Sequence, residues 1–194
     1  MRFSVAAVRA ATLLLLVVLS ACATVPPGAF DRLVVGKTIE GRLSVRYKDL
    51  ETTKEDALSG RFVWTSSGDD LELSLLDPLG QTVALIRSSA TGSSITFRDG
   101  RRVDGATPEA LTQRTLGWTV PLRGMGSWLD GKADRGSAVT KLEDGRLRQD
   151  GWTIRFQADD TVPAGAPPKR IDLSYPGPPA EIEMRLVVDQ RSGG

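Results

Sequence analysis

The chemistry open to this chain is narrow, because it contains no histidine and only one cysteine, Cys22. Without histidine, the usual general base, the Ser-His-Asp arrangement and imidazole metal ligands are all excluded. Carboxylates such as Asp69, Asp70 and Glu72 could exchange protons, but clusters of this kind are usually solvated turn residues. The composition therefore disfavours an enzyme, and we assign no catalytic residue, cofactor site or metal ligand.

Residues 126–132, reading GSWLDGK, nearly match a phosphate-binding loop. In such a loop, a strand leads into the glycines, and a serine or threonine after the lysine binds Mg²⁺. Here Ala133 follows Lys132, and no strand pattern precedes Gly126. We therefore expect no nucleotide site in this segment.

The context of Cys22 predicts covalent lipid attachment. Arg2 and Arg9 precede an apolar run at 10–19, which is too short to span a bilayer comfortably and is typical of a cleaved secretory signal. Residues 19–22, reading LSAC, then match the bacterial lipobox: an aliphatic residue, two small ones and the acceptor cysteine. This predicts cleavage before Cys22 and acylation of its thiol and new α-amino group. An ordinary signal peptide with an incidental cysteine is the alternative.

Removal of residues 1–21 would leave 173 residues with 23 basic and 24 acidic side chains, a formal charge of −1. This chain lacks the basic excess expected of a nucleic-acid-binding protein. Ala23 follows the cysteine, where an aspartate would resemble an inner-membrane retention signal, so we expect a lipid-anchored outer-membrane protein that faces the periplasm. With no second cysteine, an intramolecular disulfide is excluded, and packing must stabilise the domain.

Three further boundaries follow from composition. Residues 22–36 contain Pro26-Pro27-Gly28 and little periodicity, which predicts a lipidated tether, although Phe30 and Leu33 could belong to a short helix docked on the core. Residues 37–190 carry the periodic pattern of one folded domain. Residues 191–194 are expected to be a frayed tail.

Residues 71–86, reading LELSLLDPLGQTVALI, carry the clearest strand signal in the domain. Leucines alternate with polar residues at 71–75, and Val83 and Leu85 alternate after the turn at 77–80. This period of two predicts a β-hairpin with one buried face.

The turn itself is unusual because Leu79, a large aliphatic residue, stands at its tip. Pro78 presets φ for a central turn position, and Gly80 tolerates positive φ. Loops normally present polar groups to water. Leu79 therefore either folds back over the core or faces outward towards an apolar surface such as lipid.

The remaining domain reads as short strands and tight turns, without the spacing of βαβ units. Residues 49–59 are polar and predict a long hairpin loop, and residues 159–169 predict another loop. The pattern favours a mainly β fold, an antiparallel barrel or strongly curved sheet. Further strands are predicted at 41–47, 60–65, 95–97, 101–103, 141–142, 146–149, 152–157, 171–175 and 182–188.

Two short helices interrupt the strands. Thr107-Pro108-Glu109 is typical of a helix start, with a hydroxyl cap, proline at the first position and a carboxylate favoured by the helix dipole. The first helix is predicted at 110–116, ending at Gly117, and the second at 122–129, ending at Gly131. Such helices must pack on the open end or face of a curved sheet.

Several short motifs follow one another along the chain. They are the lipobox, LLDPLGQ at 75–81, LGW at 116–118 followed by PL at 121–122, WLDG at 128–131 and QDGW at 149–152. In the order of these motifs, the chain resembles the LolB family. The match spans most of the chain after the signal, although each motif alone is only moderately specific. The family usually has asparagine where this chain has Asp77, and often an aromatic near the C-terminus, where residues 189–191 read DQR.

This resemblance implies a half-open antiparallel β-barrel with a lid of short α-helices and a hydrophobic cavity for acyl chains. It also implies a monomer that accepts acylated lipoproteins from a periplasmic carrier of the LolA type and inserts them into the inner leaflet of the outer membrane. Leu79, between Pro78 and Gly80, matches the loop leucine that delivers cargo. The candidate cavity residues are Leu43, Val45, Phe62, Trp64, Leu73, Leu75, Leu85, Phe97, Trp118, Trp128 and Leu129.

The alternative function is that of a passive structural lipoprotein whose barrel is filled by its own side chains. Burial of the candidate residues does not separate the two functions, because both a packed core and a lined cavity bury them. An apolar void inside the barrel would favour the acyl-binding function.

Overall fold

The computed structural model describes residues 35–157, 163 and 165–193. The predicted signal, Cys22 and the tether as far as residue 34 lie outside the described residues. Strands dominate the described part, and all of them belong to one sheet. They are β1 (Lys37–Asp49), β2 (Glu55–Ser67), β3 (Asp70–Leu76), β4 (Thr82–Ser89), β5 (Gly92–Phe97), β6 (Arg102–Gly105), β7 (Val139–Lys141), β8 (Leu147–Gln149), β9 (Trp152–Gln157), β10 (Arg170–Tyr175) and β11 (Ala180–Ser192).

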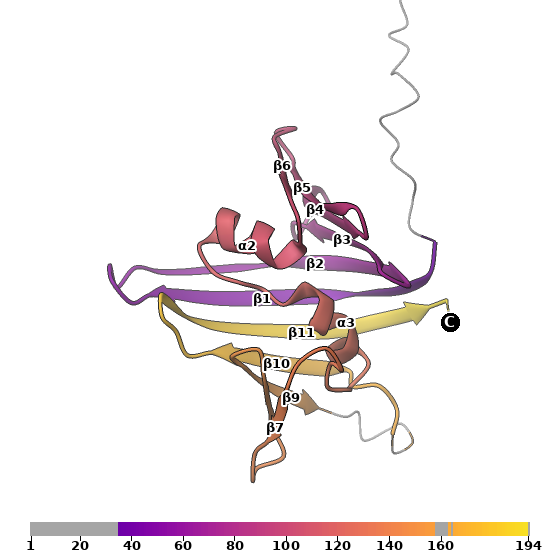
Figure 1. Cartoon of the computed structure of the whole chain (residues 1–194), viewed down its shortest axis with the longest axis vertical. Coiled ribbons are helices and arrows are strands. Elements are labelled where there is room, and N and C mark those ends of the chain that lie inside the picture. Colours follow the sequence, from indigo (N-terminus) through magenta and orange to yellow (C-terminus); the bar gives the residue numbers. More distant parts are fainter. Residues whose placement is uncertain (1–34, 158–162, 164, 194) are drawn as a thin grey trace, which may run out of the picture. The chain divides into compact units, whose positions relative to one another are not determined.

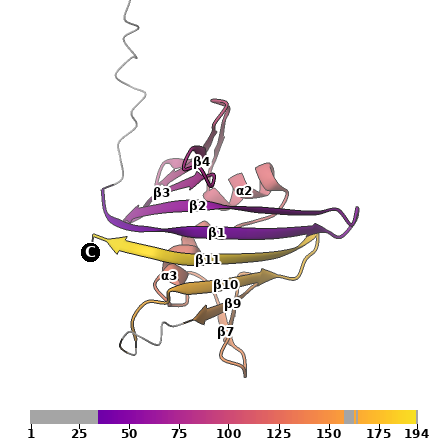
Figure 2. The ribbon, with the colours of Figure 1, turned by 180° about the vertical axis from the view of Figure 1, so that it is seen from behind.

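The sheet is antiparallel, with the order β6-β5-β4-β3-β2-β1-β11-β10-β9-β8-β7. Its two ends in sequence, β1 and β11, pair at the centre, where Leu43 lies opposite Leu186. The edge strands β6 and β7 are not paired with each other, so the described sheet does not close. Both helices lie in front of the central strands in Figure 1 and behind them in Figure 2. One face of the sheet is therefore covered by helices, as the predicted fold class requires.

The two helices form where the sequence predicted them. Helix α2 (Pro108–Leu116) begins after Thr107, whose hydroxyl accepts a hydrogen bond from the Ala110 N–H at 3.1 Å. It ends at Gly117, whose φ of 82° is costly for residues with a Cβ. Helix α3 (Leu122–Leu129) follows with Leu122, Met125 and Leu129 buried, because these residues share one face at helical spacing.

The predicted long loop at 49–59 is mostly strand, so this prediction is wrong. Strand β2 begins at Glu55, which pairs with Lys48 of β1, and only residues 50–54 form the turn. The sequence pattern was weak because residues 55–59 are all exposed, so no buried face imposes apolar alternation. Backbone pairing with β1 holds this end of β2 in the sheet.

The predicted inward face of β4 is also wrong. Ala84, Ile86 and Ser88 are buried, whereas Val83 is exposed and Leu85 only half-buried. A bulge is the cause: Leu75 pairs with Ala84, but the next residue, Leu76, pairs with Thr82. The extra residue in β4 shifts the alternation by one position, which moves every following side chain to the other face.

The expected frayed tail continues as strand. Arg191 pairs with Ile39 and Ser192 with Thr38, so β11 extends two residues past the predicted domain boundary. The Arg191 guanidinium donates a hydrogen bond to the Pro168 carbonyl at 2.9 Å and lies 3.8 Å from the Asp130 carboxylate after α3. Burial lowers the pKa of Arg191, and Asp130 opposes this shift. Nothing in the sequence around Arg191 indicated these contacts with Pro168 and Asp130, which are remote in sequence.

Candidate acyl-chain cavity and exposed turn

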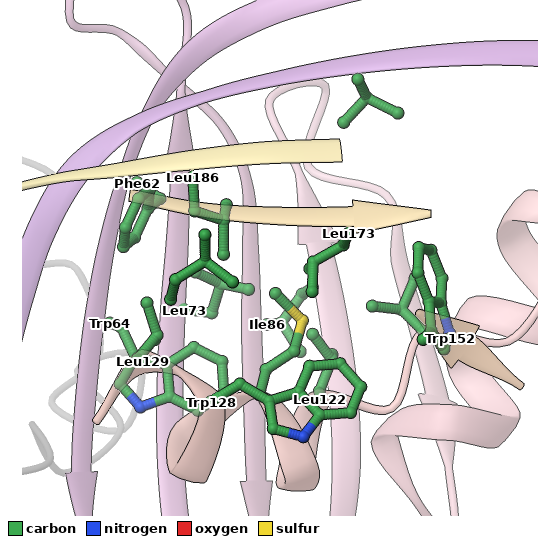
Figure 3. Packing of buried hydrophobic residues seen from close by; sticks show 14 of the residues in the cluster. Phe62, Trp64, Leu73, Ile86, Leu122, Trp128, Leu129, Trp152, Leu173 and Leu186 are labelled. Atoms are coloured by element: carbon green, nitrogen blue, oxygen red, sulfur yellow. The ribbon is translucent and has the colours of Figure 1, made fainter. Parts of the chain in front are cut away.

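An apolar cavity of about 180 Å³ lies between the sheet and the helices. Phe62, Leu73 and Leu186 extend into it from β2, β3 and β11, and Leu122 and Leu129 approach from α3 (Figure 3). None of the described residues contributes polar surface to the cavity. The full lining is Leu43, Val45, Leu58, Phe62, Trp64, Leu73, Leu75, Ile86, Thr112, Leu116, Trp118, Val120, Leu122, Met125, Leu129, Met184 and Leu186.

The structure brings most of the predicted cavity residues together. Eight of the eleven line the cavity, and three do not: Leu85, Phe97 and Trp128. Leu85 lies on the opposite face of β4, because the bulge inverts the alternation. Phe97 packs at the margin of the core, with the Arg101 guanidinium 4.2 Å above its ring. Trp128 is fully buried in the core and does not line the cavity.

Two lining residues that sequence reasoning missed are exposed leucines, and we take this pair as the mouth of the cavity. Leu58 of β2 and Leu116 of α2 both line it, yet their side chains are 58% and 49% exposed. Leu58 was missed because its polar neighbours predicted a loop. Leu116 precedes the helix-ending glycine, where exposure could not be read from the sequence. Two exposed leucines at the rim make the mouth of the cavity apolar.

Other missed residues had a signal that could have placed them. Ile86 lies two positions from Ala84 on the true inner face of β4, and Leu122 and Met125 share the apolar face of α3. Met184 and Leu186 alternate along β11, the last predicted strand. These residues line the cavity because the sheet curvature and the helices bring distant segments together.

Helix α3 is fixed against the sheet by a buried amide. The Gln149 side chain is 1% exposed, and its Oε1 accepts hydrogen bonds from Trp128 Nε1 and the Asp134 N–H, both at 2.9 Å. Its Nε2 donates to the carbonyls of Asp134 at 2.7 Å and Ser137 at 3.1 Å. All four hydrogen-bonding positions of this amide are therefore used. Trp128 serves this anchor, which explains why it lies outside the cavity lining.

The segment resembling a phosphate-binding loop belongs to this helix. Gly126 lies within α3, where a Cβ would meet the Trp64 ring at 3.3 Å. The glycine thus permits close packing of α3 on β2.

Neither α2 nor α3, the helices of the described part of the chain, has the length and apolar character needed to span a membrane.

The turn after β3 holds Leu79 away from the core. Its side chain is 85% exposed, and Pro78 and Gly80 beside it are exposed as well. The turn closes through Asp77, whose N–H donates to the Gln81 carbonyl at 2.9 Å. Gly80 adopts a φ of 82°, as the sequence predicted for this position. The possibility that Leu79 folds back over the core is therefore excluded in this structure.

Asp77 organises the turn with its carboxylate. Oδ1 accepts hydrogen bonds from the backbone N–H groups of Leu79 at 3.0 Å and Gln81 at 2.9 Å. Oδ2 accepts a hydrogen bond from Arg98 at 2.7 Å. The hydrogen bond from Gln81 and, next, the one from Arg98 lower the pKa of Asp77 below its ordinary value. The carboxylate therefore stays ionised at neutral pH and remains paired.

Comparison with known proteins shows the family of this chain. The family model described as outer membrane lipoprotein LolB matches residues 38–190. An outer-membrane lipoprotein LolB from Cupriavidus metallidurans is 32% identical over 184 residues, covering 88% of this chain and 89% of the relative. The protein of the same name from Thiobacillus denitrificans is 34% identical over 181 residues, covering 88% and 90%.

Among solved structures, a LolA-superfamily protein from Nitrosomonas europaea matches with a TM-score of 0.45 and 11% sequence identity, covering 81% of this chain and 86% of that chain. This similarity is too distant to add to the assignment. The family model spans nearly the whole described domain, and the relatives cover most of the chain. The chain belongs to the LolB family of outer-membrane lipoproteins.

Proposed function

We propose that this protein receives acylated lipoproteins from a soluble periplasmic carrier of the LolA type and inserts them into the outer membrane. The observation that carries the proposal is an apolar cavity with an apolar mouth in the same domain as an exposed leucine on a hydrogen-bonded turn. The cavity suits the holding of an acyl chain, and the turn suits contact with lipid. Membership of the LolB family supports the same assignment.

The need for such a receptor follows from the cost of exposing acyl chains to water. Each methylene costs about 0.8 kcal/mol, so a chain of about 15 methylenes costs on the order of 12 kcal/mol. Free diffusion of a lipoprotein with several such chains is therefore too slow to be useful. Since the sequence predicts no nucleotide site, we expect each transfer to run downhill in free energy. A difference of about 1.4 kcal/mol between successive binding sites biases transfer tenfold.

The volume of the cavity implies that it widens when cargo binds. An apolar cavity of about 150 Å³ is known to hold a molecule the size of benzene. The cavity here, at about 180 Å³, would hold only a short length of one acyl chain. Helix α3 is tied to the sheet through Gln149, so we expect displacement of α2, whose last residue Leu116 forms part of the mouth.

Lipid on Cys22 would keep the domain at the membrane that receives the cargo. The predicted tether then sets how far the turn can reach, and Leu79 provides an apolar contact at the bilayer. In the alternative function of a structural lipoprotein, the cavity would be an incidental packing defect and Leu79 a docking contact for another protein.

A transfer assay separates these functions. The cargo is a fluorescently labelled, acylated lipoprotein bound to a LolA-type carrier. It is mixed with vesicles in which this protein is anchored through acylated Cys22. The amount of label in the carrier, in this protein and in the lipid is then measured separately. We expect label to leave the carrier, pass through the protein and enter lipid without nucleotide. If label stays with the carrier whether or not the protein is present, the receptor function is wrong.

A further inference from the structure

The backbone N–H groups of the turn at 77–81 all donate to acceptors within the turn. Pro78 has no N–H, and the N–H groups of Leu79 and Gln81 donate to Asp77 Oδ1. The Gly80 N–H donates to the Asp77 carbonyl at 2.9 Å. No N–H at the tip is therefore left for water to satisfy. This property matters at a membrane, because an unsatisfied backbone group in hydrocarbon costs several kcal/mol.

The acceptor that achieves this is charged, which creates a second problem near lipid. Asp77 lies two residues from Leu79, and an ionised carboxylate that approaches hydrocarbon or anionic lipid is unfavourable. Arg98, in the neighbouring turn between β5 and β6, addresses this problem. Its Nη2 lies 2.7 Å from Asp77 Oδ2 and 2.8 Å from Gln81 Oε1.

The two turns are also joined through their backbones. The Arg98 N–H donates to the Val83 carbonyl of β4 at 3.1 Å. The guanidinium is thus held beside the turn by its own main chain, and it reaches both ends of the turn at Asp77 and Gln81. The lowered pKa of Asp77 is consistent with this pairing.

We propose that Arg98 is a positioning residue for membrane delivery, because it neutralises the Asp77 carboxylate and so allows the Leu79 turn to enter the bilayer surface. Asp77 Oδ1 accepts the N–H groups that shape the turn, and Arg98 neutralises the negative charge of the same carboxylate. The inference rests on the proposed function, since it specifies how the same turn meets lipid.

The test uses the transfer assay with vesicles of phosphatidylethanolamine and phosphatidylglycerol. Arg98→Ala leaves the Asp77 charge unpaired, and we expect delivery into lipid to fall about fivefold, the effect of one charge near an anionic surface. Acyl-probe affinity and melting temperature should stay at parental values. The matched control is Arg101→Ala in the same β5–β6 turn, whose guanidinium contacts Phe97 and Asp99; this variant should deliver normally.

The decisive variant combines Asp77→Asn with Arg98→Ala. Asparagine keeps the oxygen that accepts the turn N–H groups but carries no charge, so delivery should return to the parental rate. A purely structural clamp would not be rescued in this way, because Arg98 remains absent. If the double variant delivers as poorly as Arg98→Ala, or if Arg101→Ala is equally impaired, the proposal is wrong.

A physical readout supports the assay. In a Cys22→Ala, Leu79→Cys background, the chain has one cysteine at the turn tip, which can carry an environment-sensitive dye. On vesicles, the dye emission should shift to the blue in the parental turn and in the double variant, and less so with Arg98→Ala. An equal shift in all three would overturn the proposal. If Leu79→Glu delivers as well as the parent, the proposed delivery function itself fails; if only Leu79→Glu is impaired, this inference alone fails.

Discussion

Leu75 and Leu79 lie four residues apart in the chain, yet their surroundings are opposite. Leu75, near the end of β3, lines a cavity without polar surface. Leu79 projects from the following turn with 85% of its side chain exposed. Its own backbone N–H and that of Gln81 donate to the Asp77 carboxylate. Under the proposed function, this difference means that apolar residues serve two separate steps. One group can hold an acyl chain away from water, and the other can contact the membrane that receives it.

The largest expected effect is that of Leu79→Glu, which should impair only the delivery of cargo to the membrane. Burial of a leucine is worth about 1.5–3 kcal/mol, and a carboxylate in lipid reverses the sign, so delivery should fall by about a hundredfold or more. Folding and acyl binding should stay intact, because the exposed side chain contributes no core area. The measurement is the amount of cargo held by the protein against the amount in vesicles.

Leu79→Ile and Leu79→Trp are the matched controls, since both keep an apolar side chain at the tip. Each should deliver cargo at close to the parental rate. A sharp drop in melting temperature with Leu79→Glu, together with a parallel loss of cargo acceptance and release, would place Leu79 in the core and remove the contrast with Leu75.

Leu75→Trp should have the next largest effect, and it should impair only the binding of an acyl chain in the cavity. The larger side chain would occupy part of the cavity, and we expect the affinity for a fluorescent fatty acid to fall about tenfold, equivalent to about 1.4 kcal/mol. Bound cargo should still be delivered, because the turn is unchanged. Unaltered probe affinity with a loss of about 1–3 kcal/mol in unfolding free energy would instead indicate a packed core.

Variants of two tryptophans test which residues line the cavity and which belong to the packed core. Trp128→Phe removes the donor to Gln149 Oε1, so the free energy of unfolding should fall by about 1–2 kcal/mol while probe affinity stays constant. Trp118→Phe changes a residue that lines the cavity and should alter probe affinity. Chemical denaturation and probe titration of both variants give the comparison. Equal affinity changes in the two would mean that the cavity border is misplaced.

The smallest effect expected is a pH dependence of the turn. The pKa of Asp77 is lowered in the folded protein, so its stabilising contribution is fully present above the ordinary aspartate pKa and is lost as pH falls through the lowered value. Carboxyl resonances followed by NMR should show Asp77 titrating below an ordinary aspartate, and the amides of Leu79 and Gln81, which donate to its carboxylate, should shift with it. Titration of Asp77 at or above the ordinary value would contradict the hydrogen-bonded turn.

Local rules predicted much of the fold. The cap at Thr107, the glycine at Gly117 and the apolar face of α3 depend on neighbouring residues, and the structure confirms both helices. The turn around Leu79 was likewise readable from Pro78 and Gly80. The antiparallel class followed from alternation and from the absence of βαβ spacing.

The errors share one physical cause, which is that the register and extent of strand pairing were not readable from the local pattern. The bulge in β4 depends on how Leu75 and Leu76 pair, and it turned Leu85 away from the cavity. Residues 55–59 join β2 through backbone bonds to β1 without an apolar pattern. Gln149 and Arg98 each have partners remote in sequence, so neither could be identified as an anchor from local pattern alone.

The most direct test of the account is titration of the full chain carrying Cys22→Ala with a fluorescent fatty acid. This variant lacks only the acceptor for the lipid anchor, so the domain and its cavity are unaltered. The account predicts saturable binding that an unlabelled fatty acid displaces, because the apolar cavity and its mouth at Leu58 and Leu116 accept the chain. The absence of saturable, displaceable binding by a folded protein would contradict it and favour a structural lipoprotein with a filled barrel.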